Sequence, residues 1–193
     1  MRSIILASQS PRRKQLLEWA EVPFEIIIQN TDESFPTEMP IIEVPVHIAL
    51  QKALAVKNYV QQAFHGIHAN ATILAADTIV VHDNKVIGKP KDKYDAMQIL
   101  SALSGEHHQV ITGVVILHGN KEIAFADVTD VEFHPLTKEQ IEFYVNKYQP
   151  YDKAGAYAIQ EWIGVVGIKQ IKGDFYNVMG LPISRVVQEL EKL

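Results

Sequence analysis

The chain has 193 residues, of which 47% are hydrophobic and 21% are charged, a composition typical of globular proteins. This length lies below the size at which single cores usually split, so we expect one domain over residues 1–193. Lys and Arg number 18 and Asp and Glu number 23, which gives a net charge of -5. Because proteins that follow a phosphate backbone usually carry a basic face, a nucleic-acid polymer is not an expected partner.

Cysteine is absent, which excludes a disulfide framework, a thiol nucleophile and a cysteine metal site. The short apolar run near the N-terminus passes directly into basic residues, unlike a secretory signal. No uninterrupted apolar stretch approaches the roughly 20 residues that a membrane helix needs. We therefore expect a cytoplasmic protein without membrane contact.

Apolar periodicity and turn residues predict alternating strands and helices. In chain order, the expected elements are a strand at 4–7, a helix at 12–19, a strand at 24–28, a polar loop at 29–40, a helix at 42–60, strands at 72–81 and 86–88, a helix at 95–103, strands at 110–117 and 123–133, a helix from 137 to about 147, a glycine-rich stretch at 153–167, a strand around 165–171 and a final helix after Pro182.

Turn and cap residues punctuate this order. Residues 83–84 and 119–120 are turn pairs that favour hairpins, and Gly105 is placed to close a helix as a left-handed cap. Thr137 and Gln140 have the spacing of a capping box. Antiparallel hairpins inside an irregular alternation of strands and helices predict an α/β fold with a mixed, twisted sheet and flanking helices.

The segment after the first strand carries unusual charges. Ser10 suits an N-cap and Pro11 the first helical position, and Arg12, Arg13 and Lys14 then occupy the first turn. Cations there oppose the helix dipole at roughly 0.3–1 kcal/mol each, whereas a bound anion gains from both the cations and the free N–H groups. The pattern indicates a phosphate site, with solvated surface cations as the alternative.

Asp77 stands inside an apolar strand, where alternation places it on the same face as Ile73, Ala75 and Ile79. Such an acid could hold a divalent cation or accept a proton from an attacking water. The alternative is a carboxylate hydrogen-bonded to the backbone at a strand end. Strict alternation sends the neighbouring Thr78 to the opposite face unless the strand bends there.

Other candidate residues carry weaker signals. Asp32 and Glu33 in the polar loop could supply a second carboxylate, although loop acids are commonly solvated. Lys52 lies at the edge of a helix's apolar stripe, where a surface lysine is the common interpretation, and Lys89 lies between Gly and Pro at a hairpin end. The eight histidines show no HExxH pair and no GxSxG sequence is present, so neither a histidine zinc site nor that type of hydrolase nucleophile is expected.

Taken together, five motifs in order along nearly the whole chain resemble the Maf family of nucleoside triphosphate pyrophosphatases. They are Leu-Ala-Ser-Gln-Ser-Pro-Arg-Arg at 6–13, Ala-Asp-Thr-Ile-Val at 76–80, Gly-Lys-Pro at 88–90, Asp-Lys-Ala-Gly-Ala-Tyr at 152–157 and Gly-Leu-Pro at 180–182. The resemblance implies a fold like that of the inosine-triphosphate pyrophosphatases, elongated and with a deep central cleft, and a homodimer.

The resemblance also implies a reaction. Family members cleave a nucleotide between its α- and β-phosphates and release a monophosphate and pyrophosphate, with Mg²⁺ or Mn²⁺ as cofactor. By the same resemblance, Asp77 is the proton acceptor and holds the metal with Glu33. The residues that match the family's phosphate-holding set are Ser8, Arg12, Arg13, Lys52 and Lys89.

Three positions bear on the substrate. Arg12, Thr78 and Gln160 match the branch that acts on dTTP and UTP, whereas the 7-methyl-GTP branch typically has a bulky aromatic, Gln and an acidic residue there. The alternatives are a 7-methyl-GTP or other purine nucleotide pyrophosphatase, and a nucleotide-sensing regulatory module in cell division, suggested by the family's early association with septum formation. Ala158 and Glu161 stand where many family members have glycine, and Glu161 and Trp162 are expected to alter the rim of the substrate site.

Overall fold

The computed structural model describes residues 3–63 and 71–193. The chain forms two compact units, each assembled from separate stretches of sequence. Unit 1 consists of Met1–Asp77, Thr112–Asp127 and Gly180–Leu193, and unit 2 consists of Thr78–Ile111 and Val128–Met179. Within the described residues, no helix has both the length and the apolar character needed to cross a bilayer.

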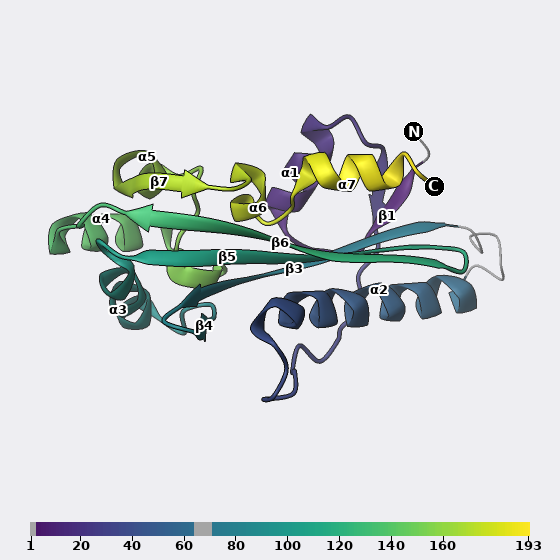
Figure 1. The fold of residues 1–193 in the computed structure, drawn as a ribbon, viewed down its shortest axis with the longest axis horizontal. Coiled ribbons are helices and arrows are strands. Elements are labelled where there is room, and N and C mark those ends of the chain that lie inside the picture. Colours follow the sequence, from purple (N-terminus) through teal and green to yellow (C-terminus); the bar gives the residue numbers. More distant parts are fainter. Residues whose placement is uncertain (1–2, 64–70) are drawn as a thin grey trace. The chain divides into compact units, whose positions relative to one another are not determined.

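The elements follow one another as shown in Figure 1. They are β1 (Ile4–Leu6), α1 (Pro11–Trp19), β2 (Phe24–Ile26), η1 (Ile41–Glu43), α2 (Val44–Ala63), β3 (Thr72–His82), β4 (Lys85–Ile87), α3 (Lys93–Leu103), β5 (His107–His118), β6 (Lys121–Phe133), α4 (Lys138–Tyr148), η2 (Ala154–Ala156), α5 (Trp162–Gly167), β7 (Ile168–Lys172), α6 (Phe175–Met179) and α7 (Ile183–Leu190).

The described strands form one sheet in the order β2-β1-β3-β5-β6-β7, with β4 paired to β3. β1 runs parallel to both β2 and β3. β4 runs antiparallel to β3, and β7 runs antiparallel to β6. The predicted mixed sheet with flanking helices is therefore confirmed.

In unit 1, α2 covers one face of the central strands, and Figure 1 shows α1 and α7 on the other side. Small residues of α2, among them Ala49 and Ala53, are fully buried and pack in one cluster with Ile73 and Ala75 of β3. Ile73 and Ala75 thus share a face, as strand alternation predicts. This packing fixes the position of α2, the helix that carries Lys52, on β3.

The start of α2 lies directly on β5 at Gly113. A Cβ atom added to Gly113 would meet the amide nitrogen of Val46 at 2.2 Å and the carbonyl carbon of Pro45 at 2.3 Å. Only glycine leaves room for the helix backbone at this distance. Gly113 therefore sets where α2 begins, two helical turns before Lys52.

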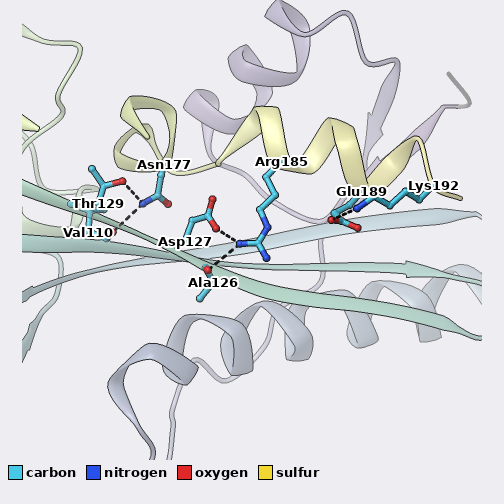
Figure 2. A network of polar contacts seen from close by, with 8 residues as sticks. All are labelled: Val110, Ala126, Asp127, Thr129, Asn177, Arg185, Glu189 and Lys192. Atoms are coloured by element: carbon cyan, nitrogen blue, oxygen red, sulfur yellow. Dashed lines mark hydrogen bonds and ion pairs between the residues drawn. The ribbon is translucent and has the colours of Figure 1, made fainter. Parts of the chain in front are cut away.

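The C-terminal helix α7 is joined to β6 through Arg185, which Figure 2 shows close up. The Arg185 guanidinium donates to a carboxylate oxygen of Asp127 and to the carbonyl of Ala126, and it lies 4.0 Å from the ring centroid of Phe125. A guanidinium can make this combination because its planar fork donates in the plane and stacks on an aromatic face.

In unit 2, α3 packs against α4 and η2. The short helix α6 is held by Asn177, whose buried amide nitrogen donates to the carbonyl of Val110 and to the Thr129 hydroxyl, both at 3.0 Å (Figure 2). One amide thereby connects α6 with β5 and β6.

Several turn and cap predictions are confirmed. Asp83 and Asn84 both have positive φ, at 50° and 58°, as a tight hairpin turn requires, and Gly105 has φ +76°. Thr137 and Gln140 exchange both hydrogen bonds of a capping box at the start of α4.

Other boundaries were wrong. Residues 165–167 belong to helix α5, so the strand predicted at 165–171 begins only at Ile168. A short β-branched apolar run does not distinguish a strand from a buried helical turn, and here Gly164 of α5 lies close against the carbonyl of Ile159, which precedes the helix. The strand predicted at 24–28 ends at Ile26, the turn 41–43 precedes α2 as a 3-10 helix, and α6 was not predicted.

Candidate active site

The connection between β1 and α1 places Ser8 and Arg13 in contact. Ser10 is the N-cap of α1 and Pro11 its first residue, as predicted. The Ser8 hydroxyl oxygen accepts from the backbone amide of Ser10 at 3.2 Å and from a terminal nitrogen of Arg13 at 3.1 Å. The Arg13 Nε donates to the carbonyl of Gly180 at 2.7 Å.

Arg13 is a buried cation, with only 8% of its surface exposed. Burial lowers the pKa of its guanidinium and the positive charge of Arg12 lowers it further, while the negative charges of Asp77 and Glu33 raise it. An arginine nevertheless stays protonated in proteins, so this corner of unit 1 holds a fixed positive charge. Its bonds to Ser8 and Gly180 shape the loop that precedes α1.

Lys52 brings two carboxylates together in unit 1. Its Nζ lies 2.7 Å from Oε1 of Glu33 and 2.8 Å from Oδ1 of Asp77. The side chains of Lys52 and Asp77 are 17% and 15% exposed, and that of Glu33 is 53% exposed. Partial burial strengthens such charge interactions relative to the open surface. The surface-lysine interpretation is therefore wrong for Lys52.

The two acids of the loop at 29–40 differ in what they contact. Glu33 reaches Lys52, whereas both oxygens of Asp32 accept hydrogen bonds from Ser34, one from its amide at 3.0 Å and one from its hydroxyl at 2.8 Å. These bonds lower the pKa of Asp32. Of the two loop acids, Glu33 is thus the one joined to Asp77 through Lys52.

The pair of carboxylates suits a hard divalent cation. Oxygen ligands are those that Mg²⁺ and Mn²⁺ prefer, and two oxygens already converge on one positive group, the Lys52 ammonium. Among the residues that the structure describes, no group of three or more His, Cys, Asp or Glu side chains could hold a metal alone. Phosphate and water oxygens would have to complete the coordination shell, as is usual for Mg²⁺.

Unit 2 carries Thr78, Lys89 and Gln160. Lys89 and Gln160 are exposed and Thr78 is half-buried. The backbone joins two of these segments, because the amide of Gly155 donates to the carbonyl of Gly88 at 3.2 Å.

Gly155 is needed in that contact for two reasons. It has φ +71°, and an added Cβ would lie 2.9 Å from a methyl group of Val80. The segment that leads to Gln160 therefore lies against β3 and beside the residue that precedes Lys89.

The segment after Gly155 is anchored by a buried pair. The Tyr157 hydroxyl and Nε2 of His108 are 2.7 Å apart, and both rings make edge contacts with Phe133. Burial, and to a lesser extent the charges of His82 and His107, lower the pKa of His108 to about 4, while burial raises the pKa of Tyr157. His108 is therefore neutral near pH 7.

The structure groups the predicted site residues by unit. Those in unit 1 are Ser8, Arg12, Arg13, Glu33, Lys52 and Asp77, and those in unit 2 are Thr78, Lys89 and Gln160. Contacts join Ser8 to Arg13, and Lys52 to both Glu33 and Asp77. Sequence reasoning missed the roles of the Gly180 carbonyl, His108 and Tyr157. The motifs at 180–182 and 152–157 contain Gly180 and Tyr157, whereas no motif contains His108.

The fold of the chain resembles that of a solved structure. The Ham1 protein of Staphylococcus aureus matches with a TM-score of 0.51 at 13% identity, and the match covers 97% of this chain and 100% of that one. At this identity the likeness concerns the fold alone.

Sequence relatives are closer. A protein of Cytophaga hutchinsonii named dTTP/UTP pyrophosphatase is 49% identical, covering 98% of this chain and 84% of the relative. Proteins of the same name from Bacteroides thetaiotaomicron and Bacillus mycoides are 45% and 44% identical, covering 98% and 100% of this chain and 95% and 96% of their own lengths. The Maf-like protein family matches residues 3–193. The chain therefore belongs to the Maf family.

Proposed function

We propose that this protein hydrolyses dTTP and UTP to the monophosphate and pyrophosphate, assisted by Mg²⁺ or Mn²⁺. The observation that carries the proposal is the Glu33–Lys52–Asp77 cluster, in which two carboxylates meet one ammonium in a partly buried position. The relatives named dTTP/UTP pyrophosphatase supply the substrate.

Asp77 is the proposed base. In the proposed reaction a water oxygen forms a bond to the α-phosphorus, and the bond from that phosphorus to the bridging oxygen breaks. The electron pair of that bond leaves with pyrophosphate. Because Oδ1 of Asp77 accepts from Lys52, we assign transfer of the water's proton to Oδ2.

The cations of the chain hold the phosphates. Charge spreads over phosphoryl oxygens during the transfer, so fixed positive groups stabilise the transition state. Arg12, Arg13 and Lys52 would provide positive charge in unit 1 and Lys89 in unit 2, and the Ser8 hydroxyl would donate a hydrogen bond to a phosphate oxygen. A divalent cation held by Glu33 and Asp77 would neutralise phosphate charge when bound.

Gln160 is the proposed reader of the base. Its amide is exposed and has both a donor and an acceptor, which matches the imide edge of thymine and uracil. Arg12 and Thr78 are assigned to the same preference by the family resemblance. The single domain over 1–193 is retained as a proposal, supported by a family match that runs through both units. The homodimer and the cytoplasmic location stay predictions.

The test is pyrophosphate release from a panel of canonical and modified nucleoside triphosphates with Mg²⁺ or Mn²⁺, run with wild type and Asp77→Asn. Wild type should favour dTTP and UTP, and the variant should lose at least about 100-fold in kcat, the contribution expected of a general base. Asp32→Asn, in the same loop as Glu33, is the matched control and should retain activity.

The outcomes separate the alternatives. Preference for 7-methyl-GTP or another purine would keep the chemistry and overturn the substrate assignment. Turnover by Asp77→Asn within a few-fold of wild type would overturn the base assignment. Nucleotide binding without any hydrolysis would favour a sensing module instead.

A further inference from the structure

A tight turn in unit 2 presents Gln160 to solvent. The amide of Glu161 donates to the carbonyl of Ala158 at 3.1 Å, which closes a four-residue turn over residues 158–161. Ile159 and Gln160 occupy its two central positions. Ile159 is 4% exposed, whereas Gln160 points outward. How well Gln160 is aimed thus depends on how firmly this turn is held.

One hydroxyl holds both ends of the turn. Tyr144, a fully buried residue of α4, accepts a hydrogen bond from the amide of Ala158 at 3.1 Å and donates one to Oε2 of Glu161. The two contacts therefore bracket Gln160 on either side. A fully buried ring on a capped helix is a rigid support, because close packing leaves the ring little room to move.

The Glu161 carboxylate extends this support to the start of the segment. Its Oε1 lies 3.7 Å from Nζ of Lys153, and the same Nζ donates to Asp152 at 2.7 Å. The Lys153 side chain is only 11% exposed, so this charge interaction is weakly screened by water. Glu161 thereby connects the two ends of the segment 153–161.

Packing from α5, the helix that follows the turn, also supports the turn at 158–161. The ring centroids of Trp162 and Phe143 are 4.8 Å apart, and Phe143 is the neighbour of Tyr144 on α4. A Cβ atom on Gly164 would meet the Ile159 carbonyl oxygen at 1.7 Å, so the first turn of α5 is pressed against the turn. The backbone at 158–161 is therefore held from both α4 and α5.

We propose that Tyr144 and Glu161 are positioning residues for base recognition, which lock the turn at 158–161 so that Gln160 meets the base in one orientation. This inference rests on the proposed function, and it adds two residues that do not themselves touch the nucleotide. Preorganising a recognition group in this way strengthens binding of the matching base without taking part in the chemical step.

The decisive variant is Tyr144→Phe, which removes only the hydroxyl and keeps the ring stacked on Tyr148. Amide exchange at Ala158 should accelerate at least about tenfold, because that amide loses its acceptor. The KM for dTTP should rise about five- to tenfold, the size expected from losing one or two hydrogen bonds, with kcat within about twofold. The preference for dTTP over dGTP should fall by the same factor.

Three further variants isolate the contacts. Tyr148→Phe removes a hydroxyl one helical turn away and should behave as wild type. Glu161→Gln keeps an oxygen that can accept from the Tyr144 hydroxyl and should retain most of the preference, whereas Glu161→Ala should resemble Tyr144→Phe.

The inference is overturned by unchanged exchange at Ala158 in Tyr144→Phe, or by faster exchange with an unaltered dTTP to dGTP ratio. An equal loss of kcat for every nucleotide also overturns it, since that is the signature of general structural damage. Failure of the proposed function gives a different result. If wild type prefers a purine nucleotide, the dTTP/UTP assignment falls, and the same variants must then reduce the preference for that purine.

Discussion

The ammonium nitrogen of Lys52 lies 2.8 Å from one carboxylate oxygen of Asp77, and the two side chains come from different elements of unit 1, α2 and β3. The contact exists because the small residues of α2 pack closely on β3, so that the helix follows the same face on which Asp77 stands. An acid that interrupts an apolar strand is thus matched by a cation on the helix that covers it.

Lys52→Met should remove the charge pairing with Asp77 and Glu33 and abolish most of the activity. Two carboxylates would lose their shared cation, and one phosphate contact would disappear, so kcat/KM for dTTP should fall at least about 100-fold. Lys57→Met is the control on the same helix, because Lys57 donates to the Gly119 carbonyl and to no described carboxylate, and this variant should stay within about twofold of wild type. Equal activity of the two variants would contradict the role given to Lys52.

Arg13→Lys should destabilise the protein although it keeps the charge. A lysine has no planar fork, so it cannot serve both Ser8 and the Gly180 carbonyl from a buried position. The free energy of unfolding in urea should fall by about 3 kcal/mol. Lys14→Met changes an exposed ion pair with Glu18 and should cost no more than about 0.5 kcal/mol. An unchanged free energy of unfolding in Arg13→Lys would show that a single hydrogen bond, to Ser8 or to Gly180, is enough to stabilise this corner of unit 1.

Gly113→Ala should shift the start of α2. The added methyl group would overlap the amide of Val46, and overpacking of this kind costs about 1–3 kcal/mol. Thermal and urea unfolding measure the loss. Gly88→Ala is the matched substitution, because no atom of the described residues outside its own neighbours lies within 4 Å of the added Cβ, and it should be nearly neutral in stability. A greater loss of stability in Gly88→Ala than in Gly113→Ala would refute the close approach of Gly113 to the backbone of α2.

Stability should decline as the pH falls from about 6.5 to about 4. The pKa of His108 is lowered to about 4 by burial and by His82 and His107, so over this range the unfolded chain binds a proton that the folded protein does not. The contribution of His108 to the free energy of unfolding is complete above about pH 6.5 and amounts to about 3 kcal/mol.

His108→Phe should therefore flatten the dependence of unfolding free energy on pH between 7 and 4. His107→Gln alters a histidine whose side chain is 72% exposed and should keep most of the slope. An unchanged slope in His108→Phe would mean that other groups govern acid stability.

The sequence predicted most strands and helices because their apolar spacing is regular over many residues. It failed where the signal was short, as at 165–167, which are helical, and at α6, whose five residues are too few to show a period. Asp77 was conspicuous because a charge in an apolar strand is costly unless it is paired.

Other parts of the candidate site needed three-dimensional packing. Lys52 has the sequence context of an ordinary surface lysine, and only the seating of α2 reveals its two partners. The bond from Arg13 to Gly180 joins residues 167 positions apart, which no local pattern encodes. The same holds for Tyr144, whose contacts with Ala158 and Glu161 follow from how α4 packs.

The assembly of unit 1 from three stretches of chain has a consequence for synthesis on the ribosome. A nascent chain that ends before residue 180 already contains Asp77, Lys52 and Glu33, but it lacks the carbonyl that receives Arg13 and the helix α7 that pairs with Asp127. Unit 1 therefore cannot close around its charged residues until Gly180 and α7 have been synthesised. Competence for the reaction should arise in one step, after these residues have left the exit tunnel, and not gradually as the chain lengthens.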